Sequence, residues 1–151
     1  MRLRKIMSGG QTGVDRAALD AARELGITIG GWCPKGRRAE DGAIAKHYPL
    51  VETRARNYAQ RTEWNVRDTT ATLVLTAGKI AGGTALSVQL AKEMARPCLV
   101  VCLDGGEDAG AVRRWLAGHR VETLNIAGPR ESELAGIHAR AKSFLVTVLR
   151  V

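Results

Sequence analysis

Two glycine-rich segments of this chain combine residue types that suit the binding of an anion. The first is Gly9-Gly10-Gln11-Thr12-Gly13 and the second is Gly82-Gly83-Thr84. Each follows an apolar run and precedes a helical pattern, so each is predicted to join the end of a strand to the start of a helix. Such a turn presents unpaired backbone N–H groups at the positive end of the helix dipole. Any α/β protein needs tight strand-to-helix turns, but two of this composition favour a shared pocket for a phosphate or another oxyanion.

The charge of the chain agrees with an anionic ligand. Lys and Arg number 23 against 15 Asp and Glu, which gives a formal net charge of +8. A positive field of this kind raises the local concentration of anions. The basic residues are spread along the chain, however, and aromatic residues make up only 4%, too few to stack a single nucleic-acid strand. A small anionic ligand is therefore favoured over nucleic acid.

The composition is that of a globular protein. With 151 residues and 45% hydrophobic content, we expect one domain over residues 1–151. We find no apolar run long enough to span a membrane and no signal peptide, which predicts a cytoplasmic protein. Cys33, Cys98 and Cys102 form no C-x-x-C pair, and the last two share an apolar run. We therefore expect buried thiols in a reducing compartment and no metal site.

Strands and helices are expected to alternate along the chain. The predicted strands are 3–8, 27–32, 50–53, 71–76, 97–103 and 122–127. The predicted helices are 14–25, 57–67, one that Thr84 caps, 108–118 and 129–149. Thr12 and Asp15 have the spacing of a capping box at the start of the first helix. The segment 33–42 is rich in Gly, Pro and charge, and we expect it to be an irregular loop.

This alternation predicts an α/β fold. Continuous apolar strands indicate a parallel sheet with helices on both faces, which makes three layers. Right-handed crossovers favour a doubly wound, Rossmann-like sheet, for which we expect the strand order 3-2-1-4-5-6. In that order the first and fourth strands are neighbours where the winding reverses. Both glycine segments would then open onto the same crevice, which is the usual ligand site of such sheets.

The first glycine segment differs from the dinucleotide-binding fingerprint. Ser8 stands where G-x-G-x-x-G requires its first glycine. Asp15, in the first turn of the helix, would repel a phosphate lying directly on it unless a cation or a donor lies between them. Asp15 is therefore predicted either to stabilise the start of the helix or to accept a hydrogen bond from the ligand.

Four segments resemble a known family. They are SGGQTGVDR at 8–16, GWCPKGRRAEDG at 31–42, TEWNVRD at 62–68 and GGTAL at 82–86. Together they are similar to the molybdenum cofactor carrier proteins, relatives of the cytokinin-activating phosphoribohydrolases and of the DNA-processing protein of transformation. The similarity extends to about residue 103. It implies a Rossmann-like, cytoplasmic homo-oligomer that stores or carries molybdenum cofactor, a phosphorylated pterin dithiolene, without transforming it.

The resemblance also implies a set of binding residues. The first turn would contribute Gly9, Gly10, Gln11, Thr12 and Gly13, and the second turn would contribute donors from Gly82, Gly83 and Thr84. Lys35, Gly36 and Arg37 would form a positively charged loop that closes over the ligand. Glu40, Asp41, Glu63 and Asn65 would either contact the ligand or hold Lys35 and Arg37 in place.

The resemblance to the phosphoribohydrolases fails at a catalytic position. Their motif resembles P-G-G-x-G-T-x-x-E, and when Thr84 is aligned with its threonine, Ser87 stands at the glutamate. A carboxylate that stabilises an oxocarbenium-like centre is therefore missing there. We predict no catalytic residue and favour a binding protein. Two alternatives stay open: a glycosidase acting on a nucleoside monophosphate, and a module that senses a nucleotide or nucleic acid.

Overall fold

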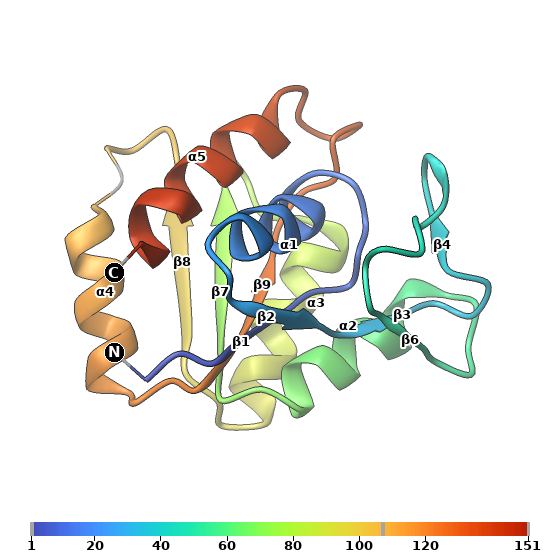
Figure 1. The fold of residues 1–151 in the computed structure, drawn as a ribbon, viewed down its shortest axis with the longest axis horizontal. Helices are drawn as coiled ribbons and strands as arrows, with labels where there is room; N and C mark the ends of the chain where they lie inside the picture. The colour runs from blue at the N-terminus through green and yellow to red at the C-terminus, as the bar shows by residue number, and fades with distance from the viewer. Residues whose placement is uncertain (1, 107, 151) are drawn as a thin grey trace.

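A computed structural model describes residues 2–106 and 108–150 (Figure 1). Its centre is a five-stranded sheet in the order β2-β1-β9-β7-β8, in which every neighbouring pair is parallel. The strands are β1 (Lys5–Met7), β2 (Thr28–Gly30), β7 (Ala71–Thr76), β8 (Cys98–Cys102) and β9 (Thr123–Ala127). The predicted α/β class with a Rossmann-like parallel sheet is confirmed.

Helices cover both faces of this sheet. They are α1 (Val14–Glu24), α2 (Tyr58–Arg67), α3 (Gly82–Glu93), α4 (Ala109–Gly118) and α5 (Ile137–Leu149). On one face α5 packs against α1 and α4, and on the other face α2 packs against α3 (Figure 1). The buried side of α1 is made largely of alanines, whose small side chains let the helix lie close to the sheet. The three predicted layers are therefore present.

The order of the strands differs from the predicted one. We expected the last strand at an edge, but β9 lies between β1 and β7 and pairs with both. The first and fourth predicted strands are therefore not neighbours. If β9 is counted first, followed by β1, β2, β7 and β8, the order becomes 3-2-1-4-5, the start of the Rossmann order. The chain thus has a Rossmann order whose first strand and helix stand at its C-terminal end.

The segment between β2 and α2 forms small sheets of its own. The strand predicted over 27–32 ends at Gly30, because Gly31 has a φ of +135° and an added Cβ would lie 2.2 Å from the Ser8 carbonyl oxygen. Beyond it β3 (Trp32–Cys33) pairs with β6 (Val51–Glu52). The third predicted strand is therefore outside the central sheet. The expected irregular loop contains a hairpin of β4 (Arg38–Ala39) and β5 (Gly42–Ala43).

The predicted cap of α1 and the predicted starts of α3 and α5 are wrong, whereas α1 begins at Val14 as expected. Gly13, not Thr12, caps α1, and Asp15 turns back to accept a hydrogen bond from the N–H of Gln11 at 3.3 Å. Helix α3 begins two residues before Thr84, with Ala81 as its N-cap and no side-chain cap among the described residues. Helix α5 begins at Ile137, not at 129, because Gly136 adopts a left-handed conformation that a helix does not contain.

The cysteines also differ from expectation. Cys33 is buried, Cys98 is half-buried and Cys102 is exposed. The predicted burial of Cys102 is wrong because β8 is an edge strand of the sheet and is covered less completely than β7. In the described part of the chain, we find no helix with the length and apolar character needed to cross a membrane.

Candidate anion-binding site

The loops that follow β1, β7 and β9 surround a cleft of about 210 Å³. It is lined by Gln11, Asp15, Tyr58, Arg61, Thr62, Gly82, Gly83, Thr84, Ser87, Ala127, Gly128, Arg130 and Glu133. The cleft lies at the carboxyl ends of β9 and β7, which correspond to the first and fourth strands of the Rossmann order. This is the point where the winding reverses and where ligands of open α/β sheets bind. The two glycine segments therefore meet at one cleft, with β9 between their strands.

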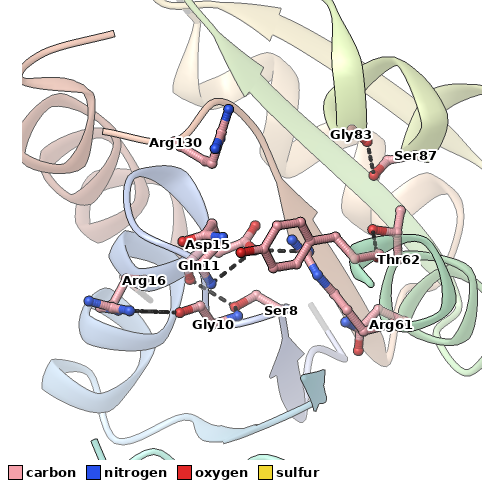
Figure 2. A network of polar contacts seen from close by, with 12 residues as sticks. Ser8, Gly10, Gln11, Asp15, Arg16, Arg61, Thr62, Gly83, Ser87 and Arg130 are labelled. Carbon is pink, nitrogen blue, oxygen red and sulfur yellow. Dashed lines mark hydrogen bonds and ion pairs between the residues drawn. The ribbon is translucent and has the colours of Figure 1, made fainter. Parts of the chain in front are cut away.

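An ion pair occupies one side of the cleft (Figure 2). The Oδ2 atom of Asp15 accepts hydrogen bonds from Arg61 Nη1 at 3.1 Å and from the N–H of Gln11 at 3.3 Å. Asp15 is only 3% exposed. Burial raises the pKa of this carboxyl, while the Arg61 guanidinium and the Gln11 N–H oppose that rise. Arg61 is thus a cation beside Asp15, which offsets the repulsion that Asp15 alone would exert on a phosphate.

Gly9 makes room for this guanidinium. A Cβ added at Gly9 would lie 2.2 Å from Arg61 Nη1. The first glycine turn therefore lets the Arg61 side chain pass against the backbone on its way to Asp15. Close packing against Arg61 therefore explains why residue 9 is a glycine.

Several hydrogen-bond donors at the cleft have no acceptor among the described residues. Gln11 is 3% exposed; its Oε1 accepts from the N–H groups of Thr12 and Glu40, while its Nε2 is unpartnered. The Nε of Arg61 is also buried and unpartnered. The first residues of α3, Gly82–Thr84, line the cleft, and their N–H groups have no side-chain cap among the described residues. An unsatisfied buried donor costs about 1–3 kcal/mol, so an oxyanion in the cleft would supply acceptors that the described protein groups do not.

Arg130 adds positive charge on the wall formed by the loop between β9 and α5 (Figure 2). Its Nε lies 2.9 Å from Glu133 Oε1, and its Nη1 lies 3.5 Å from Glu40 Oε2. On the opposite wall, the Ser87 hydroxyl donates to the Gly83 carbonyl at 3.1 Å. The two arginines and the positive end of α3 make the cleft suitable for an oxyanion.

Glu40 lies outside the cleft but connects two of its walls. Its carboxylate accepts hydrogen bonds from the Thr12 hydroxyl and from the N–H of Ser132, the latter at 3.1 Å. It also forms the ion pair with Arg130, and its backbone N–H donates to Gln11 at 2.9 Å. The hydrogen bonds from Ser132 and Thr12 lower the pKa of Glu40. The β4–β5 hairpin thus holds together the two loops that carry Gln11 and Arg130.

Other residues of the first glycine segment lie elsewhere. Thr12 and Gly13 border a separate hollow next to the start of α5, together with Glu40 and Asp41. The Gly10 carbonyl accepts a hydrogen bond from Arg16, which also pairs with Asp41. Of the five predicted residues in this segment, Gln11 lines the cleft.

The segment Lys35–Arg37 does not line the cleft. The Arg37 guanidinium instead donates to four backbone carbonyls of the segment 44–50, which it holds in place. The Gly36 N–H donates to the Glu52 carboxylate at 2.6 Å, and Lys35 is exposed. This placement gives Arg37 a structural role.

The predicted supporting residues do not hold Lys35 or Arg37. Glu40 and Asp41 are engaged by other groups, as described above. The Asn65 side chain pairs with the backbone of Trp32, accepting from its N–H at 2.8 Å and donating to its carbonyl at 3.0 Å. Glu63 is exposed on α2 and does not line the cleft. The prediction that these four residues hold Lys35 and Arg37 in place is therefore wrong in the described structure.

The sequence contained one overlooked signal for the cleft. Gly128 follows the apolar strand β9, so it is a third glycine at a strand end, and it introduces the loop with Arg130. A Cβ at Gly128 would lie 2.3 Å from the Leu75 carbonyl oxygen, so β9 and β7 approach closely there. Arg61 gave no comparable signal, because its partner Asp15 is 46 residues away.

The model of the circularly permutated YpsA SLOG family matches residues 6–149. The chain belongs to this family. The permutation in the family's description agrees with the order of the sheet, in which the last strand takes the place of the first.

One solved structure is also very similar. It is the crystal structure of a protein from Syntrophus aciditrophicus SB titled "Putative molybdenum carrier protein". The two are 40% identical, the match covers 98% of this chain and 96% of that chain, and the TM-score is 0.93. The family resemblance of the sequence is thereby confirmed. None of the curated proteins compared with this SLOG-family chain matches it.

Within residues 2–106 and 108–150, no group of three or more His, Cys, Asp or Glu side chains could hold a metal ion.

Proposed function

We propose that this protein binds a phosphorylated anion in the cleft and that it stores or carries molybdenum cofactor. The observation that carries the proposal is the convergence of unpartnered donors from Gln11, Arg61 and the start of α3 on one cleft. The name of the similar crystal structure supports the choice of molybdenum cofactor as the cargo.

The residues fit the phosphate of this cargo. We assign the phosphate oxygens to the N–H groups of Gly83 and Thr84 and to Gln11 Nε2, with Arg61 and Arg130 supplying positive charge. Binding without hydrolysis agrees with Ser87, whose hydroxyl lines the cleft where the related hydrolases have glutamate. The homo-oligomeric state and the cytoplasmic location stay predictions.

The test is the lifetime of free molybdenum cofactor in solution. Stoichiometric protein should extend this lifetime, and Arg130→Gln should shorten it again because a cation at the cleft is lost. Arg140→Gln is a matched control: its side chain is 43% exposed against 44% for Arg130, and each pairs with a carboxylate. Arg140 does not line the cleft, so this variant should protect as the wild type does. An unchanged cofactor lifetime with the wild type would count against the proposal.

A glycosidase acting on a nucleoside monophosphate is the second candidate. The observation in its favour is that two carboxylates, Asp15 and Glu133, line the cleft. Both carboxylates are paired with arginines, however, at 3.1 and 2.9 Å. Release of free adenine from AMP by the purified protein would support the enzyme and contradict the carrier.

A further inference from the structure

Positive charge continues outside the cleft, beyond the ring of Tyr58. Tyr58 is the first residue of α2 and lines the cleft. Two guanidinium groups flank its ring: the Cζ of Arg61 lies 5.5 Å from the ring centroid, and the Cζ of Arg38 lies 5.4 Å from it. Arg61 belongs to the cleft, whereas Arg38 is exposed on the β4–β5 hairpin.

Arg38 is one of three exposed cations that we call the basic rim: Lys35, Arg38 and Arg56. Arg38 Nη1 donates to the Arg56 carbonyl at 2.9 Å, and the Lys35 N–H donates to the Ala55 carbonyl at 3.0 Å. The segment that carries Lys35 and Arg38 therefore lies beside the segment that carries Arg56. In the described ranges, none of the three forms an ion pair with a carboxylate. By contrast, Arg61 and Arg130 in the cleft both do.

The position of Arg38 suits a second anion. Stacking on Tyr58 and the single hydrogen bond to Arg56 orient the guanidinium, while its other N–H groups have no partner among the described residues. Because both cations lie against one ring, Arg38 and Arg61 are no more than about 11 Å apart. One small molecule can therefore reach both.

We propose that the ligand carries two anionic groups, one bound in the cleft and the other bound by Arg38 at the basic rim. The chemical class is a compound whose two anionic groups are joined by a short link, and a phosphoanhydride is a simple probe for this class. This inference rests on the proposed function for its inner site, and it adds an outer subsite that selects doubly anionic ligands. The rim cations also raise the local concentration of such ligands before they enter the cleft.

The experiment compares orthophosphate with tripolyphosphate by isothermal titration calorimetry at fixed ionic strength. The wild type should bind tripolyphosphate at least tenfold more tightly than orthophosphate. Arg38→Gln should weaken tripolyphosphate binding about tenfold and orthophosphate binding less than twofold, because the inner site is intact. Arg38→Lys, which keeps the charge, should recover part of the loss.

Arg23→Gln is the matched control. Arg23 is exposed in the last turn of α1, away from the cleft, and its loss changes the net charge equally. If Arg38→Gln and Arg23→Gln bind tripolyphosphate alike, or if the wild type binds both probes equally, the outer subsite is refuted while the inner site stands. If orthophosphate does not bind to the wild type at all, the proposed function fails and this inference fails with it.

Discussion

Asp15 and Arg61 depend on each other inside the protein. Asp15 is 3% exposed, and its carboxylate is bonded to Arg61 and to the N–H of Gln11. Two charges taken out of water pay a desolvation cost that their attraction offsets only while both are present. The pair therefore places a cation at the cleft without leaving a bare carboxylate there.

This dependence can be measured by a double-mutant cycle. Arg61→Met should lower the free energy of unfolding by about 3 kcal/mol at neutral pH, because it leaves a buried carboxylate without its cation. Asp15→Asn combined with Arg61→Met should cost far less than the sum of the two single changes, as measured by urea denaturation. Additive effects would contradict the coupling.

The same variant should respond to pH in a defined direction. Burial raises the pKa of Asp15, so the folded state holds this proton more strongly than the unfolded chain does. Protonation of Asp15 therefore contributes to the free energy of unfolding at acid pH, and this contribution is lost as pH rises through the folded-state pKa. Since Arg61→Met removes the opposing cation, its stability defect relative to the wild type should shrink as the solution is acidified.

Among the elements, the β4–β5 hairpin does not line the cleft but contacts two loops that do. Through Glu40 it joins the loop after β1 to the loop after β9. These loops carry Gln11 and Arg130, so the hairpin acts on the ligand by positioning other residues. The segment Lys35–Arg37, in contrast, is tied to the backbone of 44–50.

Glu40→Gln should therefore weaken orthophosphate binding about fivefold to tenfold, since a charged hydrogen-bond partner contributes about 1.5–3 kcal/mol, part of which the amide retains. Asp41→Asn is the control, because Asp41 is next to Glu40 in the sequence but its carboxylate pairs with Arg16, which does not line the cleft. Calorimetric titration measures both, and thermal unfolding checks that both variants are folded. Equal affinities would remove Glu40 from its positioning role.

Acidification should also weaken orthophosphate binding by the wild type, because it protonates Glu40. The pKa of Glu40 is held below its ordinary value of 4.5, so the carboxylate contributes at neutral pH and is lost as pH falls through this lowered value. The orthophosphate affinity of Glu40→Gln should therefore fall less on acidification than that of the wild type, because the variant has no carboxylate at residue 40 to protonate.

At the scale of the whole molecule, the order of the sheet differs from its order along the chain. With β9 counted first, the strands follow the Rossmann order, and the cleft lies at its usual reversal point. This predicts that a chain opened at residue 119, before β9, with its original ends joined by a flexible Gly/Ser linker, folds to the same structure. Circular dichroism should be unchanged, and orthophosphate affinity should stay within about twofold of the wild type. An unfolded or non-binding product would contradict the permutation as an account of this fold.

The sequence predicted the elements with strong local patterns. Strand β7 was predicted to the residue, because six consecutive residues that suit a fully buried strand stand between the polar residues 68–70 and the glycine-containing turn that begins at Ala77. Helix α4 was predicted to within one residue, since Asp108 caps it by accepting from the N–H of Ala111. The start of α5 was missed because the segment before Gly136 has the composition of a helix but not its backbone conformation.

The candidate site likewise has features that the sequence predicted and features that only the tertiary structure decided. The amino-acid sequence alone determined that strand-end glycines would expose backbone donors, because turn and helix propensities act between near neighbours. Only the tertiary structure decided that β9 separates β1 from β7, that Arg61 reaches Asp15 and that Glu40 joins two loops. Strand pairing and charge pairing depend on distances through space, and an apolar strand or an arginine carries no local mark of its distant partner.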